Sequence, residues 1–186
     1  KAISATTSVE DAGTALNDAL TALRDENLSS DTSAAQQSIV SAFGEASAKA
    51  ISATTSVEDA GTALNKAMEF LQKTSLDTTK AKTTLIQSFT LSVSDEIKTS
   101  SSKDFEKLKS QAIEALTKLK GSGNQALDDL IDQSLTIINS VPAPVPVAPS
   151  GSGSKNKKAG NDGKGDGNKT DPKTDPKTDP KTDPKT

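Results

Sequence analysis

The chain has 186 residues, with 22 basic and 25 acidic side chains, so its formal net charge is −3. It contains no His, Cys, Trp or Tyr, which excludes disulfides, thiolate and imidazole catalysis, and the usual zinc, iron and copper sites. The hydrophobic fraction is 32%, below the roughly 45–50% (Gly included) of an average globular domain. We therefore expect no enzyme, no cofactor and no small-molecule substrate.

The distribution of charged and apolar residues bears on the partners. Arg24 is the only arginine, and no basic patch carries stacking aromatics, so we expect no nucleic-acid binding. No run approaches the ~18–20 apolar residues needed to cross a bilayer, so no membrane partner is predicted. The sequence starts at Lys1 without a hydrophobic leader, and we expect any secretion signal to lie outside it.

Proline divides the chain into two unlike parts. All eight prolines lie between Pro142 and Pro184, and the segment 1–141 is permissive for helices because no proline removes a backbone donor. Residues 142–186 combine a Pro-x-Pro run, Gly/Ser stretches and a Thr-Asp-Pro-Lys repeat. This segment cannot build a core, so it is predicted to be a disordered linker.

The first part contains an internal repeat. Residues 1–17 recur without change at 49–65, and apolar positions further along match more loosely at the same offset of 48. A duplicated unit of this size is typical of helical-hairpin repeats. We therefore predict a helical domain over 1–141, made of a 48-residue repeat (1–48 and 49–96) and a third helical pair at 102–140.

Apolar residues at three- and four-residue steps predict the helices in chain order. The first copy gives helices over 9–23 and 35–50, the second over 57–71 and 85–97, and the third pair over 105–119 and 127–138. Thr7 and Glu10 have the spacing of a capping box for the first helix, and Asn27 marks a break and a new N-cap. Gly121 and Gly123 mark the last turn.

The predicted fold class is all-α, a bundle of five or six antiparallel helices with a disordered C-terminal tail. A stacked helical solenoid is the less favoured alternative, because there are so few units. The apolar stripes are narrow and rich in Ala, which predicts a thin core, modest stability and a route to β-structure under stress.

Several residues are candidates for more than packing. The acidic pairs that begin with Glu10 and Glu58 are interpreted as complements to helix dipoles and not as acid/base pairs. Gly13 and Gly61 interrupt predicted helices at a cost of roughly 1 kcal/mol each, and we expect close helix packing there.

Modification is predicted at sequons and at a threonine-rich, mucin-like tract. The candidate glycosylation sites are Asn27, Asn168, Thr170, Thr174, Thr178 and Thr182.

The segment 41–56 resembles the repeat domains of spider silk proteins (spidroins). It is Cys-free and rich in Ser and Ala, with the sequence Ser41-Ala-Phe-Gly-Glu-Ala-Ser-Ala-Lys-Ala-Ile-Ser-Ala-Thr-Thr-Ser56. The run Pro142–Pro149 is similar to the linkers of pyriform attachment silk, and the Lys/Asp/Thr/Pro tail to the glycosylated spacers of aggregate-gland glues. The chain departs from fibre-type spidroins because it lacks poly-Ala blocks, Gly-Gly-x tracts and Tyr. The resemblance thus implies a glue or cement.

On this basis we expect a secreted, extracellular structural protein, one repeat unit of a silk or silk-like adhesive whose partners are like repeat units. The alternative is a secreted or cell-surface helical binding module, an adhesin, on a Pro-rich stalk. Many near-identical copies of the unit in the gene would favour a material, whereas one copy beside a wall anchor would favour an adhesin.

Overall fold

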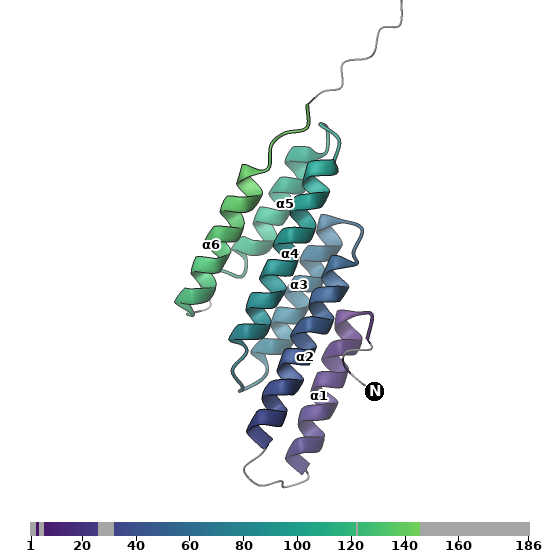
Figure 1. Cartoon of the computed structure of the whole chain (residues 1–186), viewed down its shortest axis with the longest axis vertical. Helices are drawn as coiled ribbons and strands as arrows, with labels where there is room; N and C mark the ends of the chain where they lie inside the picture. Colours follow the sequence, from purple (N-terminus) through teal and green to yellow (C-terminus); the bar gives the residue numbers. More distant parts are fainter. Residues whose placement is uncertain (1–2, 4–5, 26–31, 122, 146–186) are drawn as a thin grey trace, which may run out of the picture. The chain divides into compact units, whose positions relative to one another are not determined.

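A computed structural model describes residues 3, 6–25, 32–121 and 123–145 of the chain. Within these residues the secondary structure is helical, with no strand. The α-helices are α1 (Val9–Asp25), α2 (Thr32–Ser52), α3 (Val57–Gln72), α4 (Thr79–Thr99), α5 (Phe105–Thr117) and α6 (Gln125–Ser140) (Figure 1). The predicted all-α bundle of five or six helices is confirmed, with six.

The caps that start the repeated helices lie one residue later than predicted. The backbone N–H of Asp11 donates to Ser8 Oγ at 3.1 Å, and that of Asp59 donates to Ser56 Oγ at the same distance. The assignment of the first cap to Thr7 and Glu10 is therefore wrong by one position. The box is Ser-x-x-Asp, in which a Ser hydroxyl accepts from the third helical amide and so satisfies a donor that has no helical partner.

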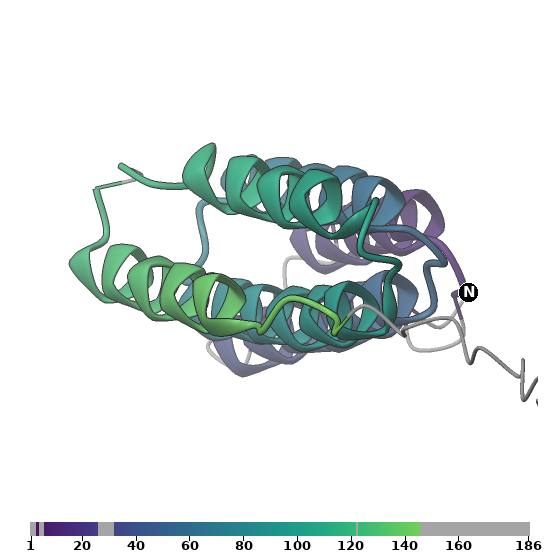
Figure 2. The same ribbon diagram turned by 90° about the horizontal axis from the view of Figure 1, so that it is seen from above.

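The six helices form two layers, as Figure 2 shows from above. One layer holds α1, α3 and α5, and the other holds α2, α4 and α6. Each helix packs against its neighbour in the chain and against the equivalent helix of the next pair. The bundle is therefore built from helical pairs that lie side by side. Neighbouring pairs of a helical solenoid pack in the same way.

A continuous apolar core lies between the layers. Phe43, Leu64, Phe89 and Ile97 are completely buried, and Phe43 meets the half-buried Phe70 edge-on at a ring-centroid distance of 6.0 Å. Many other core positions are Ala, as the narrow stripes predicted. Among the described residues, the core therefore combines many large apolar side chains with nine alanines, which fill the narrower gaps between helices.

Glycines bring equivalent helices close together. A Cβ atom placed on Gly44 would lie 2.8 Å from Ala81 Cβ, and one on Gly61 would lie 3.2 Å from Ala115 Cβ. At Gly13 the same atom would meet the ring of Phe70 at 2.4 Å. The close packing predicted for Gly13 and Gly61 is confirmed, because a side chain at either position would press on the next helix.

The last helix ends at Ser140, and Val141 and the residues after it leave the helical conformation just where Pro142 was predicted to stop it. Gly121 and Gly123 have positive φ angles of 85° and 80°, which only Gly adopts readily in the turn between α5 and α6. The predicted linker over 142–186 lies outside the described residues from 146 onward, as does the predicted break at Asn27.

Candidate functional site

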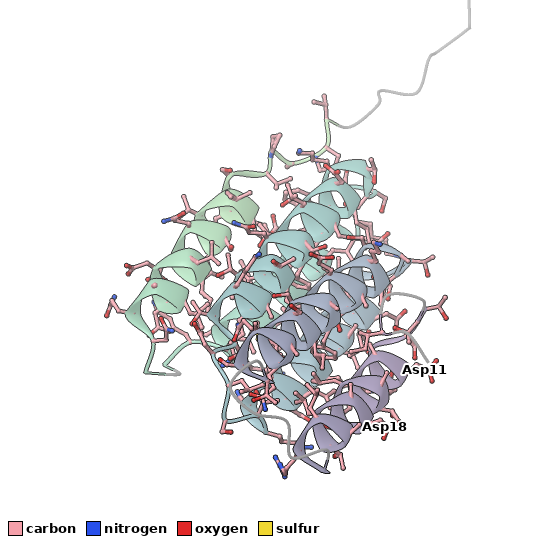
Figure 3. All side chains as sticks on the ribbon, turned by 60° about the horizontal axis from the view of Figure 1, so that its bottom comes forward. Asp11 and Asp18 are labelled. Atoms are coloured by element: carbon pink, nitrogen blue, oxygen red, sulfur yellow. The ribbon has the colours of Figure 1, made fainter. Side chains whose placement is uncertain are left out.

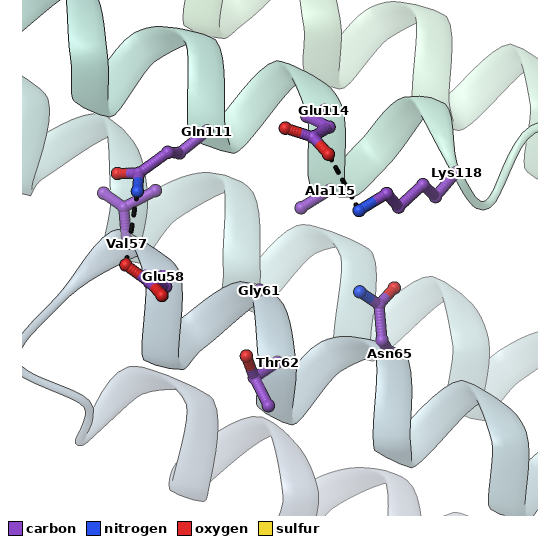
Figure 4. Close-up of a pocket in the computed structure, with 9 residues that line it drawn as sticks. All are labelled: Val57, Glu58, Gly61, Thr62, Asn65, Gln111, Glu114, Ala115 and Lys118. Carbon is purple, nitrogen blue, oxygen red and sulfur yellow. Dashed lines mark hydrogen bonds and ion pairs between the residues drawn. The ribbon is translucent and has the colours of Figure 1, made fainter.

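A shallow groove lies between α3 and α5 (Figure 4). It encloses about 250 Å³ and is open to solvent along one side. Its lining residues are small or polar and come from facing turns of two equivalent helices: Val57, Glu58, Gly61, Thr62, Asn65, Gln111, Glu114, Ala115 and Lys118. Gly61 and Ala115 have almost no side chain, and beside them one polar contact crosses the groove, from Gln111 to Glu58.

The polar contacts in this groove are weak and exposed. Gln111 Nε2 donates to Glu58 Oε2 at 3.4 Å across the interface, and Nζ of Lys118, which caps the end of α5, lies 2.9 Å from Glu114 Oε1. The hydrogen bond from Lys118 holds the pKa of Glu114 below its ordinary value. The groove therefore holds one polar contact between the two helices, from Gln111 to Glu58.

The α1–α3 interface repeats the same arrangement. Lys66 of α3 forms an ion pair with Glu10 of α1, and the hydrogen bond from Lys66 lowers the pKa of Glu10. Glu10 and Glu58 occupy the same place in the two identical segments 1–17 and 49–65. The position of Glu58 is therefore a repeated contact between equivalent helices, which the acidic-pair interpretation did not identify.

The third helical pair also carries the repeat, in a form that the sequence analysis missed. Ser101 Oγ donates to Asp104 Oδ2 at 2.6 Å and accepts from the backbone N–H of Asp104 at 3.3 Å, as Ser56 does with Asp59. Just before each Ser-x-x-Asp box, a hydroxyl donates to an Ile carbonyl at 2.7 Å: Thr6 to Ile3, Thr54 to Ile51 and Ser100 to Ile97. The recurring Ile, hydroxyl and Ser-x-x-Asp pattern is the sequence signal for the third unit.

The candidate glycosylation sites all lie outside the described residues: Asn27, Asn168, Thr170, Thr174, Thr178 and Thr182. Within the part of the chain that the structure describes, no three His, Cys, Asp or Glu side chains gather as a metal site would require. In that same part, none of the helices combines the length and the apolar character needed to cross a membrane.

No family model matches the chain, and neither curated proteins nor solved structures give a match. The chain's own repeat and the interfaces between its equivalent helices are therefore the features that bear on its function.

Proposed function

We propose that the chain is an extracellular structural protein, one repeat unit of a silk or silk-like adhesive. The observation that supports this most is the stacking of equivalent helices through a repeated contact, Glu10 with Lys66 and then Glu58 with Gln111. A unit that joins its own copies through one recurring contact has the organisation needed to extend by adding like units. The helical body would supply surfaces for self-association.

The surface charge fits storage at high concentration. The segment 1–141 carries 13 basic and 19 acidic side chains, a net charge of −6 that keeps like copies apart. The carboxyls of Glu10 and Glu114 have lowered pKa values because Lys side chains bond to them, so they stay ionised as the pH falls toward 4.5. In the proposed role, the Pro- and Lys/Asp-containing linker holds water between the bodies.

The core contains features that favour rearrangement under stress. Ser47 and Ser94 are buried, and neither hydroxyl has a hydrogen-bond partner among the described residues. A buried polar group without a partner destabilises the packed state by about 1–3 kcal/mol. Many surface positions of α4 are Thr or Ser, which tolerate strands when helix packing is lost. We propose that stretching converts part of the body to β-structure.

The test compares the full chain in dilute buffer and after shear and drying. The far-UV circular dichroism spectrum of the dilute chain should be helical, and the infrared amide I band of the sheared film should shift toward β-structure. A dilute chain that is mostly β or unfolded would contradict the proposal. A film that keeps its helical band, together with saturable binding of labelled chain to whole cells, would favour the adhesin.

A further inference from the structure

The polar contact between equivalent helices is made at equivalent positions in each unit. In the α1–α3 interface, Glu10 of the first helix meets Lys66 of the second. In the α3–α5 interface, Glu58 of the first helix meets Gln111 of the second. Lys66 and Gln111 are related by an offset of 45, the same as Ser56 and the equivalent Ser101 in the third unit. Each helix therefore has one face toward the next unit and a different face toward the preceding unit.

A second contact, between a glycine and a side chain of the next helix, also recurs at equivalent positions. Phe70 of α3 lies against Gly13 of α1, and Ala115 of α5 lies against Gly61 of α3. Phe70 and Ala115 are again related by the offset of 45, and Gly13 and Gly61 by the offset of 48. At each interface, a glycine on the first helix receives a side chain from the second.

At the two ends of the stack, α1 and the turn before α5 carry the residues equivalent to these contact positions. On α1, Asp18 is the counterpart of Lys66 at the offset of 48, on the edge that faces away from α3. Figure 3 shows Asp11 and Asp18 on this outer edge, where both are exposed and line one groove. At the other end, the exposed Lys103 is the counterpart of Glu58 at the offset of 45, in the turn that leads into α5.

The charges at the two ends are reversed relative to those inside the stack. At the two interfaces inside the stack, the helix that is earlier in the chain supplies a Glu, and the later helix supplies Lys66 or Gln111. At the ends of the stack, Lys103 occupies the position of the Glu, and Asp18 occupies the position of Lys66. A pair formed between Lys103 and Asp18 would therefore again join opposite charges.

The sizes at the ends are reversed as well. Glu106, exposed at the α5 edge, is the third-unit counterpart of Gly61. Ala22, exposed at the α1 edge, is the first-unit counterpart of Phe70. The larger side chain is therefore on the α5 edge and the smaller one on the α1 edge. The two edges can still pack at the same helix-to-helix distance as the interfaces inside the stack.

We propose that the α1 edge of one copy binds the α5 edge of a second copy of this chain, with Lys103 of one copy next to Asp18 of the other. The proposal rests on the self-association in the proposed function and names its surface. Because two different edges meet, the contact is heterologous, and every copy that is added presents a fresh edge. The product is an open row of copies and not a closed dimer.

The test uses sedimentation equilibrium of the full chain at low ionic strength over a range of concentrations. The wild-type average mass should rise past that of a dimer as concentration increases. Asp18→Lys and Lys103→Glu should each lower the association constant about three- to tenfold, because an exposed opposite-charge pair becomes a like-charge pair. The double variant D18K/K103E should return to within about twofold of wild type, and an equimolar mixture of the single variants should also associate.

Matched controls are available on α4, which lies between α2 and α6 in the middle of its layer. Asp95 and Lys98 form an exposed ion pair at 3.5 Å within that helix. Asp95→Lys and Lys98→Glu change the net charge as the test variants do, and each should leave the association constant within about twofold of wild type. At 1 M salt, where the Debye length is about 3 Å, the differences among all variants should largely vanish.

Three outcomes would overturn the docking surface. These are a wild-type chain that stays monomeric to about 1 mM, a mass that stops at the dimer, and single variants that associate like their α4 controls. Failure of the double variant to recover would also overturn it, provided that its circular dichroism spectrum stays helical.

The film experiment separates this result from the proposed function. A monomeric chain whose sheared film still gains β-structure would refute the docking surface and leave the silk-like role standing. A chain that forms open rows but keeps its helical band when sheared and dried would support the docking surface and refute that role.

Discussion

Replacing Gly44 with Ala tests whether the stack depends on close backbone approach. The added Cβ would lie 2.8 Å from Ala81 Cβ and 2.9 Å from Ala81 Cα, where α2 meets α4. Ordinary carbon contacts are about 3.5–4.0 Å, so the helices must separate by up to about 1 Å. One of the opposing atoms belongs to the backbone and the other is fixed to it, so no side-chain rotation can relieve the contact.

Two effects of opposite sign set the magnitude. Gly to Ala inside a helix stabilises by about 1 kcal/mol, whereas overpacking a well-packed contact costs about 1–3 kcal/mol. Because the clash at Gly44 is with backbone, we take the upper end and expect a net loss of about 1–2 kcal/mol. Gly61→Ala is the matched comparison, since its Cβ would lie 3.2 Å from Ala115 Cβ, a contact that needs a shift of only a few tenths of an ångström. There the helix preference should prevail, for a gain of about 0.5 kcal/mol.

The assay is urea and thermal unfolding followed by circular dichroism. For a folded body of this size, the expected loss at Gly44 lowers Tm by roughly 3–8 °C, and Gly61→Ala leaves Tm unchanged or slightly higher. Equal stabilisation by both substitutions would refute the reasoning, because helix preference alone would then decide the outcome and the close approach would carry no cost.

Three further predictions use the same unfolding assay. Ser56→Ala removes the cap that accepts from the N–H of Asp59 and should cost about 1 kcal/mol, and an unchanged midpoint would contradict the cap. Ser47→Ala removes a buried, unpartnered hydroxyl and should stabilise by about 1 kcal/mol, whereas Ser88→Ala, whose hydroxyl donates to the Ala48 carbonyl at 3.0 Å, should destabilise. Because the pKa of Glu10 is lowered in the folded chain, the stability that it contributes is complete above pH 4.5 and is lost as the pH falls through the lowered value. The difference between Glu10→Gln and wild type should therefore be full at pH 7 and shrink as the pH falls below 4.5, and a difference that does not change with pH would contradict the ion-pair contribution.

The sequence was sufficient to predict the helices, because apolar spacing reports directly which side of a helix is buried. Val57, Leu64 and Leu71 recur at seven-residue intervals on α3, and all three are buried. The end of α6 was equally clear, since Pro142 cannot continue a helix. The cap was misplaced by one residue because Thr7 and Ser8 both offer a hydroxyl, and only backbone geometry decides which one accepts from the helix.

The stacking and its contacts were harder to predict. An apolar stripe shows that a face is buried and does not show which helix covers it, so the sequence favoured a simple bundle over stacked pairs only because the units are few. The equivalence of Lys66 and Gln111 was hidden because the third unit follows the second at an offset of 45 and not 48, and few of its residues are identical. The reversed charges of Asp18 and Lys103 have meaning only after that register is known.

Residue-resolved amide hydrogen exchange of the full chain tests the central claim most directly, that stacked helical pairs form one folded unit joined to a linker that does not fold. We expect the slowest exchange in the buried turns of α3 and α4, which have equivalent helices on both sides, and faster exchange in α1 and α6 at the ends of the layers. The sequence-based prediction for residues 149–186 is exchange at the rates of free peptides. Protection of those last residues equal to that of α3, or free-peptide rates throughout α3 and α4, would contradict the account.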